Sequence, residues 1–178
     1  MSFNKELAKE IFKAAHITGD FLLRSGQRST EYFDKYRFEA LPHILKQVAK
    51  ESVSHIEDHH DALAGLETGG IPLATALSLE SGKSVCFVRK EAKTYGTCQF
   101  AEGFDIKDKN LLVIEDVVTT GGQLKQSIKD LRESGAQITT ALCVIMRGPK
   151  EEIKKVFKEE LNVDLKWLFT KDELTNSN

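Results

Sequence analysis

Little net charge, few cysteines and no long apolar run limit what this chain of 178 residues can be. Its 25 Lys and Arg residues nearly balance 27 Asp and Glu residues, and the net charge of −2 argues against wholesale nucleic-acid binding. No apolar run approaches the roughly 18 residues that cross a membrane. The N-terminus lacks the apolar segment of a signal peptide. We therefore expect a cytoplasmic protein with no nucleic-acid or membrane partner.

The three cysteines exclude a thiol-based metal or redox motif. Cys86, Cys98 and Cys143 form no Cys-x-x-Cys pair and have no metal-ligand spacing. Cys86 and Cys143 lie in apolar segments, so we expect them to be small buried side chains. The five histidines form no metal-ligand pattern either, and we expect His59 and His60 to be a solvent-exposed helix end.

Strands alternate with helices through most of the chain, which predicts an α/β fold with a mainly parallel sheet covered on both faces. We expect one domain, with a core at about 41–146 and a small cap from about 1–40 and 147–178. Residues 21–39 show no clear period of apolar residues, and we expect 89–104, which contain Gly96 and Gly103, to be a long loop. The strands are expected at 62–64, 84–88, 111–114, 138–146 and 163–169, and helices at 7–15, 42–56, 71–79, 124–131 and 151–161.

The most informative segment is 111–122, Leu-Leu-Val-Ile-Glu-Asp-Val-Val-Thr-Thr-Gly-Gly. Four apolar residues predict a buried parallel strand, after which we expect Glu115 and Asp116 to stand at the strand end. A Thr/Gly loop follows and leads into a helix, whose free N–H groups and dipole favour an anion. The acids are suited to accept hydrogen bonds from sugar hydroxyls. Together these features predict a site for a ribose 5-phosphate.

Two more loops leave strands at the same edge of the predicted sheet, where ligands of such folds bind. Residues 65–70 are glycine-rich and precede a helix, so their N–H groups are suited to a pyrophosphate. Arg89, Lys90 and Lys93 bring three cations to the long loop, and cations suit a polyanion. Neither the Walker pattern nor Gly-x-Gly-x-x-Gly occurs, which points away from the common nucleotide-binding loops.

The 111–122 segment resembles the phosphoribosyl pyrophosphate (PRPP) binding motif of type I phosphoribosyltransferases. Residues 20–34, Asp-Phe-Leu-Leu-Arg-Ser-Gly-Gln-Arg-Ser-Thr-Glu-Tyr-Phe-Asp, resemble the N-terminal signature of the orotate phosphoribosyltransferases within that group. The Arg-Lys-x-x-Lys loop at 89–93 and Arg147 match the same family. The resemblance therefore runs from about residue 20 to 148 and implies the type I phosphoribosyltransferase fold.

The resemblance also implies the reaction, which is a step of pyrimidine (UMP) biosynthesis. N1 of orotate displaces pyrophosphate from C1 of PRPP and gives orotidine 5′-monophosphate. Arg89, Lys93 and Asp116 are the implied catalytic residues, and Mg²⁺ is the implied cofactor, held mainly by PRPP and not by the protein directly. The implied PRPP-binding residues are Thr68, Gly69, Gly70, Arg89, Lys90, Lys93, Glu115, Asp116, Val117, Val118, Thr119, Thr120, Gly121 and Gly122. The implied orotate-binding residues are Arg24, Tyr32, Phe33, Thr119 and Arg147.

A homodimer is implied as well, because the 89–103 loop in this family commonly reaches the partner subunit's site. Four positions depart from the usual pattern, namely Arg24, Gly69, Tyr95 and Met146. They leave two alternatives open: a phosphoribosyltransferase for another base, or a regulator that binds PRPP without catalysis. Arg24 and Arg147 favour an anionic base over a neutral purine, and the cationic 89–93 loop favours an enzyme over a regulator.

Overall fold

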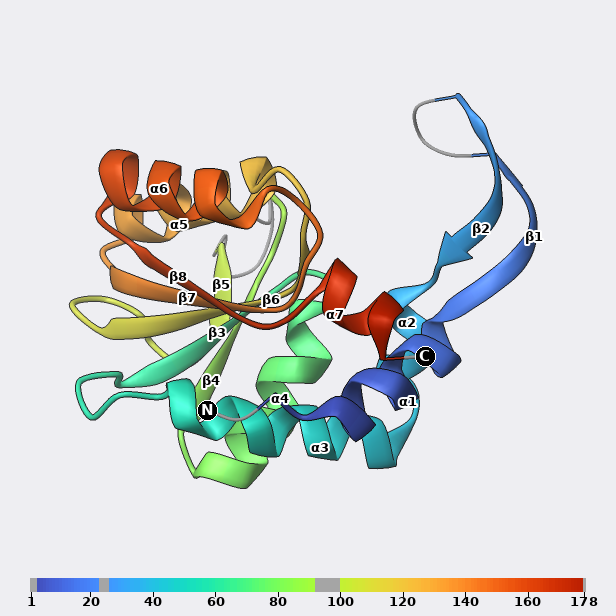
Figure 1. Ribbon diagram of the computed structural model, residues 1–178. Coiled ribbons are helices and arrows are strands. Elements are labelled where there is room, and N and C mark those ends of the chain that lie inside the picture. Colours follow the sequence, from blue (N-terminus) through green and yellow to red (C-terminus); the bar gives the residue numbers. More distant parts are fainter. Residues whose placement is uncertain (1–2, 23–25, 92–99, 178) are drawn as a thin grey trace.

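The computed structural model describes residues 3–22, 26–91 and 100–177 (Figure 1). Its centre, within these residues, is a six-stranded sheet with the order β5-β4-β3-β6-β7-β8. The edge strand β5 (Ala101–Gly103) is antiparallel to β4, and all other neighbours are parallel. The parallel strands are β3 (Ala62–Leu66), β4 (Ser84–Val88), β6 (Asn110–Val118), β7 (Gln137–Met146) and β8 (Asp164–Thr170). The predicted α/β fold with a mainly parallel sheet is confirmed.

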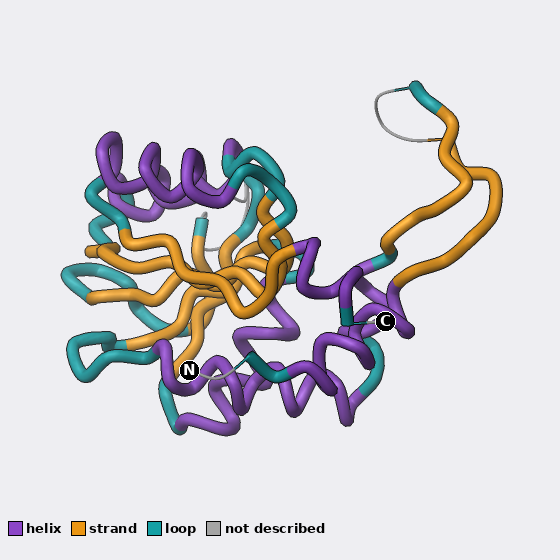
Figure 2. Tube along the Cα trace, in the orientation of Figure 1, coloured by secondary structure: helices purple, strands orange, loops and turns teal. Residues whose placement is uncertain are grey.

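Helices cover both faces of this sheet (Figure 2). On one face lie α5 (Gly122–Glu133) and α6 (Lys150–Leu161). On the other lie α1 (Lys5–Ala15), α3 (Pro42–Ser52), which continues as a 3-10 turn at Val53–His55, and α4 (Gly70–Ser81). Two short helices, α2 (Lys35–Glu39) and α7 (Lys171–Asn176), lie beside α1. No helix of the described residues is long and apolar enough to span a membrane.

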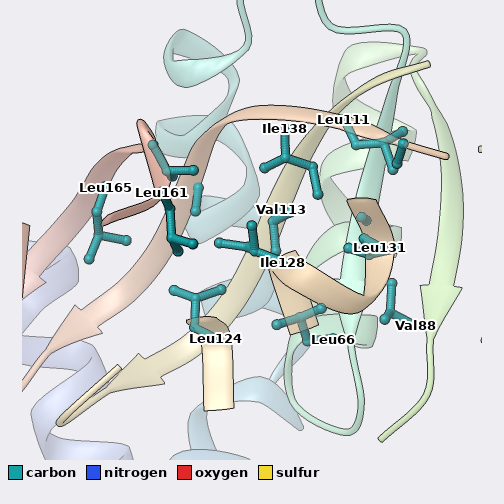
Figure 3. Packing of buried hydrophobic residues seen from close by; sticks show 14 of the residues in the cluster. Leu66, Val88, Leu111, Val113, Leu124, Ile128, Leu131, Ile138, Leu161 and Leu165 are labelled. Atoms are coloured by element: carbon teal, nitrogen blue, oxygen red, sulfur yellow. The ribbon is translucent and has the colours of Figure 1, made fainter. Parts of the chain in front are cut away.

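The sheet separates two hydrophobic cores. The α5/α6 side buries Leu124, Ile128 and Phe157 against alternate residues of the strands, such as Val113 (Figure 3). On the opposite side, Leu112 and Ile114 of the same strand pack with residues of α1, α3 and α4. Alternate side chains of β6 therefore enter different cores, which is why the sequence of this strand reads as an unbroken apolar run. Cys86 and Cys143 are free thiols in buried strand positions, as predicted.

Residues 16–33 form a two-stranded antiparallel hairpin that the sequence did not predict. Its strands are β1 (His16–Leu22) and β2 (Arg28–Phe33), and it projects away from the sheet (Figure 1). None of its described side chains is fully buried. A strand without a buried face has no alternation of apolar and polar residues to detect, because that alternation records burial. This explains why the segment showed no period.

Thr170 caps α7 with a capping box, and Ser177 is buried. Two further predictions of local structure were wrong. His60 was expected to be exposed, but its side chain is only 1 % exposed. The 89–104 segment was expected to be a loop throughout, but β5 pairs with β4 near its end, whereas 92–99 lie outside the described residues.

The division into a core and a cap stays a prediction. The terminal segments do meet, since α1 contacts α7. However, β8 pairs with β7 inside the central sheet, and α6 covers one face of that sheet. Residues 147–178 therefore contribute to the main layers as well as to the surface beside α1.

Candidate active site

The sequence analysis placed the two acids of the central motif, Glu115 and Asp116, at the end of the strand. In the structure they lie within β6. β6 continues to Val118, with Val117 and Val118 in register with Ile145 and Met146 of β7. The strand is longer than its apolar run because neighbouring β7 supplies hydrogen-bond partners past the acids. As a consequence, Glu115 and Asp116 are held by the sheet, and the loop of the motif begins only at Thr119.

Asp116 is fully buried, and each of its two carboxylate oxygens meets a polar group. The backbone N–H of Val117 donates to Oδ1 at 2.5 Å. The ammonium of Lys35, at the start of α2, forms an ion pair with Oδ2. The Asp116 side chain is 1 % exposed and that of Lys35 is 31 % exposed, so the lysine reaches in from the surface. Lys35 was missed by the sequence analysis, although it follows directly on the aromatic signature at 20–34.

Glu115 sits beside this ion pair in a different electrostatic state. Burial, together with the hydrogen bond and charge of Asp116, raises the pKa of Glu115 well above its ordinary value. Lys35 acts in the opposite direction but does not offset these effects. The raised pKa therefore favours the protonated form of Glu115, whereas the Lys35 ammonium contacts Asp116.

Gly69 and Gly70 bring the loop after β3 into contact with β6. A Cβ at position 69 would come within 1.6 Å of Asp116 Oδ2, and a Cβ at position 70 within 2.3 Å of the Ile114 carbonyl oxygen. Only glycine permits this approach. Thr68 is exposed at the tip of the same loop. The predicted pyrophosphate loop thus lies directly against the predicted ribose-phosphate acid.

The Thr/Gly loop forms the start of α5. Thr119 and Thr120 are exposed, and Gly121 has a φ of +77° at the N-cap of the helix. A side chain there would also meet the Phe157 ring at 2.7 Å, so position 121 requires glycine for two reasons. The helix N-terminus offers N–H groups without intrahelical partners beside two hydroxyls, which suits a phosphate.

The cationic loop begins at the end of β4, next to the same edge. The Lys90 N–H donates to a Glu67 carboxylate oxygen at 3.1 Å, which ties this loop to the loop after β3. The Arg89 side chain pairs with Glu102 at 3.3 Å. Lys93 and Tyr95 lie outside the described residues. The structure therefore places the root of the loop beside the site, and the role of its lysines stays a prediction.

A cavity of about 590 Å³ lies between the hairpin, α1 and α7. Tyr32, Phe33 and Arg147 line it, which brings together three of the five predicted orotate-binding residues. Arg147 also touches the donor loop, because its N–H donates to the Val118 carbonyl at 2.8 Å. Arg24 lies outside the described residues. His16 and Lys171 line the same cavity and carried no motif by which the sequence would have identified them.

The described residues contain no group of three or more His, Cys, Asp or Glu side chains arranged to hold a metal. The candidate site is instead a set of three loops at one sheet edge, with one buried ion pair and an adjoining cavity. This arrangement suits a phosphorylated sugar next to a planar group.

Comparisons with known proteins agree with this geometry. The profile of a protein family described as "Phosphoribosyl transferase domain" matches residues 36–169. The fold and site thus define a phosphoribosyltransferase.

Individual relatives narrow the class. The chain is 43% identical over 174 residues to the orotate phosphoribosyltransferase of Nocardioides sp., covering 98% of this chain and 96% of that protein. The crystal structure of orotate phosphoribosyltransferase from Aeropyrum pernix superposes with a TM-score of 0.76 at 32% identity, covering 96% of both chains. The Mycobacterium tuberculosis enzyme of the same name, in complex with Fe(III) dicitrate, shares the fold with a TM-score of 0.81 at 24% identity, covering 96% of this chain and 97% of that chain. The chain belongs to the orotate phosphoribosyltransferases, a family of glycosyltransferases.

Proposed function

We propose that this chain transfers the 5-phosphoribosyl group of PRPP to N1 of orotate and releases pyrophosphate. N1 of the deprotonated base forms the new bond to C1 of the ribose, and the C1–O bond breaks with its electron pair going to pyrophosphate. The observation that carries the proposal is the junction at Arg147. Its side chain lines the cavity with Tyr32 and Phe33, while its N–H is bonded to Val118 of the donor loop. One residue thus joins an acceptor pocket to a donor loop.

Each part of the site has a distinct role in this proposal. The Thr119–Gly122 loop and the N-terminus of α5 bind the 5-phosphate. Asp116 accepts hydrogen bonds from the ribose hydroxyls, and the loop at 68–70 offers N–H groups to the pyrophosphate. Arg89, Lys90 and Lys93 face the charge that develops on the leaving pyrophosphate. Tyr32 and Phe33 contact the planar base, and Arg147 pairs with its carboxylate, assisted by Arg24.

Mg²⁺ fits this site as a cofactor that arrives with the donor. Asp116 already receives the Lys35 ammonium and the Val117 N–H, and Glu115 is protonated at neutral pH. The acids present thus suit a metal held mainly by the pyrophosphate oxygens. When bound there, Mg²⁺ neutralises charge on the leaving group.

The family resemblance, together with the root of the 89–103 loop beside the site, supports a homodimer in which this loop serves the neighbouring subunit. We also propose a cytoplasmic location.

Two alternative functions are kept, a phosphoribosyltransferase for another base and a PRPP-binding regulator. A single experiment distinguishes them. Purified protein is given PRPP and Mg²⁺ with orotate, uracil, hypoxanthine, xanthine or adenine, and pyrophosphate release is measured. We expect pyrophosphate release with orotate and with none of the other four bases. Release with a purine instead of orotate would contradict the assignment. If none of the five bases gives pyrophosphate release, the regulator is favoured.

A further inference from the structure

Lys35 stands at the junction between the hairpin and the donor loop. It is the first residue of α2, two residues after Phe33, and Asp34 caps the helix by accepting from the Tyr36 N–H at 3.2 Å. Its side chain does not turn to solvent as those of the exposed Tyr36 and Arg37 do. It extends to Asp116 Oδ2, at the bottom of the donor site.

The carboxylate that Lys35 meets is fixed on its other sides. Val117 N–H holds Oδ1 at 2.5 Å, and Gly69 closes the space against Oδ2, where a Cβ would be 1.6 Å away. Lys35 is therefore the long, movable member of the set and the one that links it to another element. Without it, a fully buried carboxylate would lose its counter-charge, which favours its protonation or rotation.

The surrounding groups make this single cation more important. Asp34, Tyr36, Glu39, Glu115 and Asp116 are the titratable groups that act on Lys35 or on its acidic neighbours. Burial raises the pKa of Glu39 to about 8, and the charge of Asp116 adds to this shift. Burial of Lys35 opposes its charge, but the hydrogen bond and charge of Asp116 outweigh this and raise the pKa of Lys35. Lys35 and Asp116 thus form an ion pair among buried acids whose pKa values are raised.

We propose that Lys35 is a positioning residue for the donor. It keeps the Asp116 carboxylate charged and oriented towards the Thr/Gly loop, and it ties the hairpin that carries Tyr32 and Phe33 to that loop. This inference rests on the proposed function, since it assigns Asp116 to the ribose. Lys35 lies outside the three loops of the proposed donor site. It acts through Asp116 and does not contact the reacting atoms.

The test compares Lys35→Met and Lys35→Gln, which remove the charge, with Lys35→Arg, which retains it. Lys166→Met is the matched control, because it breaks an ion pair with Glu57 (2.6 Å) at a different place in the fold. Steady-state kinetics with PRPP and orotate are measured for each folded variant, and PRPP binding is measured by calorimetry. We expect Lys35→Met and Lys35→Gln to lower kcat/KM for PRPP about tenfold or more, as for the loss of one charge-assisted contact. Lys35→Arg should retain most of the wild-type kcat/KM for PRPP, and the control Lys166→Met should match wild type.

A double variant separates positioning from a merely structural role. Lys35→Met should add little to the loss caused by Asp116→Asn, since both act on one group. Wild-type donor affinity in Lys35→Met and Lys35→Gln, or additive losses in the double variant, would overturn the proposal. A wild-type protein that binds PRPP but does not use orotate would instead refute the proposed function, and calorimetry would still test Lys35.

Discussion

Gly69 lies so close to Asp116 that a methyl group added to Gly69 would come within 1.6 Å of the carboxylate oxygen Oδ2. The predicted pyrophosphate loop and the predicted ribose-binding acid are therefore in contact through a position that tolerates no side chain. This contact couples two parts of the proposed donor site that are 47 residues apart in the sequence.

The first prediction follows from this contact. Gly69→Ala should force the Asp116 carboxylate to rotate away from Lys35, and the KM for PRPP should rise about tenfold while that for orotate changes little. Steady-state kinetics with each substrate varied in turn measure this. Gly82→Ala is the control, because a methyl group there meets nothing within 4 Å, although its positive φ reduces stability. Unchanged PRPP kinetics in Gly69→Ala would show that PRPP binding does not depend on the observed orientation of the Asp116 carboxylate.

The second prediction contrasts the two adjacent acids. Glu115→Gln should be tolerated far better than Asp116→Asn, because the raised pKa of Glu115 leaves it protonated at pH 7 and an amide resembles a neutral carboxyl. Asp116→Asn removes the charge that pairs with Lys35 and should lower kcat/KM for PRPP at least tenfold. Circular dichroism confirms that both variants fold. Equal losses in the two variants would contradict the assignment of the charge to Asp116.

The third prediction concerns the acceptor. Arg147→Ala should raise the KM for orotate roughly tenfold or more and leave PRPP affinity close to wild type, since a charge-assisted contact contributes about 1.5–3 kcal/mol. The Arg147 side chain is exposed in the cavity wall, so the fold should be unaffected, and its N–H bond to Val118 does not depend on the side chain. Lys150→Ala, at an exposed position nearby in sequence, serves as the control. A selective loss of PRPP affinity would assign Arg147 to the donor instead.

The fourth prediction is a loss of stability in acid, caused by His60. Burial, with a smaller effect of His59, lowers the pKa of His60 to about 4, while the unfolded chain retains about 6.5. Between these pH values the unfolded state binds a proton at His60 and the folded state does not. The contribution of neutral His60 to the free energy of unfolding is therefore lost as the pH falls from 6.5 towards 4. The loss amounts to as much as about 3 kcal/mol. His60→Asn, whose oxygen replaces Nδ1 as acceptor for the Glu57 N–H, should flatten the stability curve over this range.

Urea unfolding of wild type and His60→Asn at pH 7, 6, 5 and 4.5 measures the effect. His43→Asn is the control, because His43 is exposed and the substitution there should leave the pH dependence unchanged. If wild type and His60→Asn lose stability in parallel as the pH falls, other groups are responsible.

The fifth prediction tests the shared site of the proposed homodimer. Lys93→Ala in one subunit and Asp116→Asn in the other are co-expressed with different tags. If Lys93 acts in the neighbouring site, one site of the mixed dimer is intact, and about half of wild-type activity returns although each mutant homodimer is nearly inactive. A mixed dimer that carries both tags and remains inactive would rule out this arrangement.

Local signals in the sequence determined the central part of this protein. The apolar run 111–114 and the periodicity of Leu124, Ile128 and Leu131 predicted β6 and α5, because burial on a sheet and on one helix face leaves regular patterns. The loops at 65–70, 89–103 and 115–122 were assigned to one edge by the topology of parallel sheets alone. The structure places the start of each of these segments there.

Only the tertiary structure decided the rest, because those features depend on contacts between distant segments. None of the described side chains of strands β1 and β2 is fully buried, so the hairpin left no pattern. β6 extends past its apolar run because β7 continues beside it. His60 is buried by neighbours that its own sequence context does not reveal. The Lys35–Asp116 pair joins residues 81 positions apart, and no local pattern records which of several lysines meets a buried carboxylate. The sequence thus determined at which loops we predict substrate to bind, and only the folded chain determined which charged groups meet there.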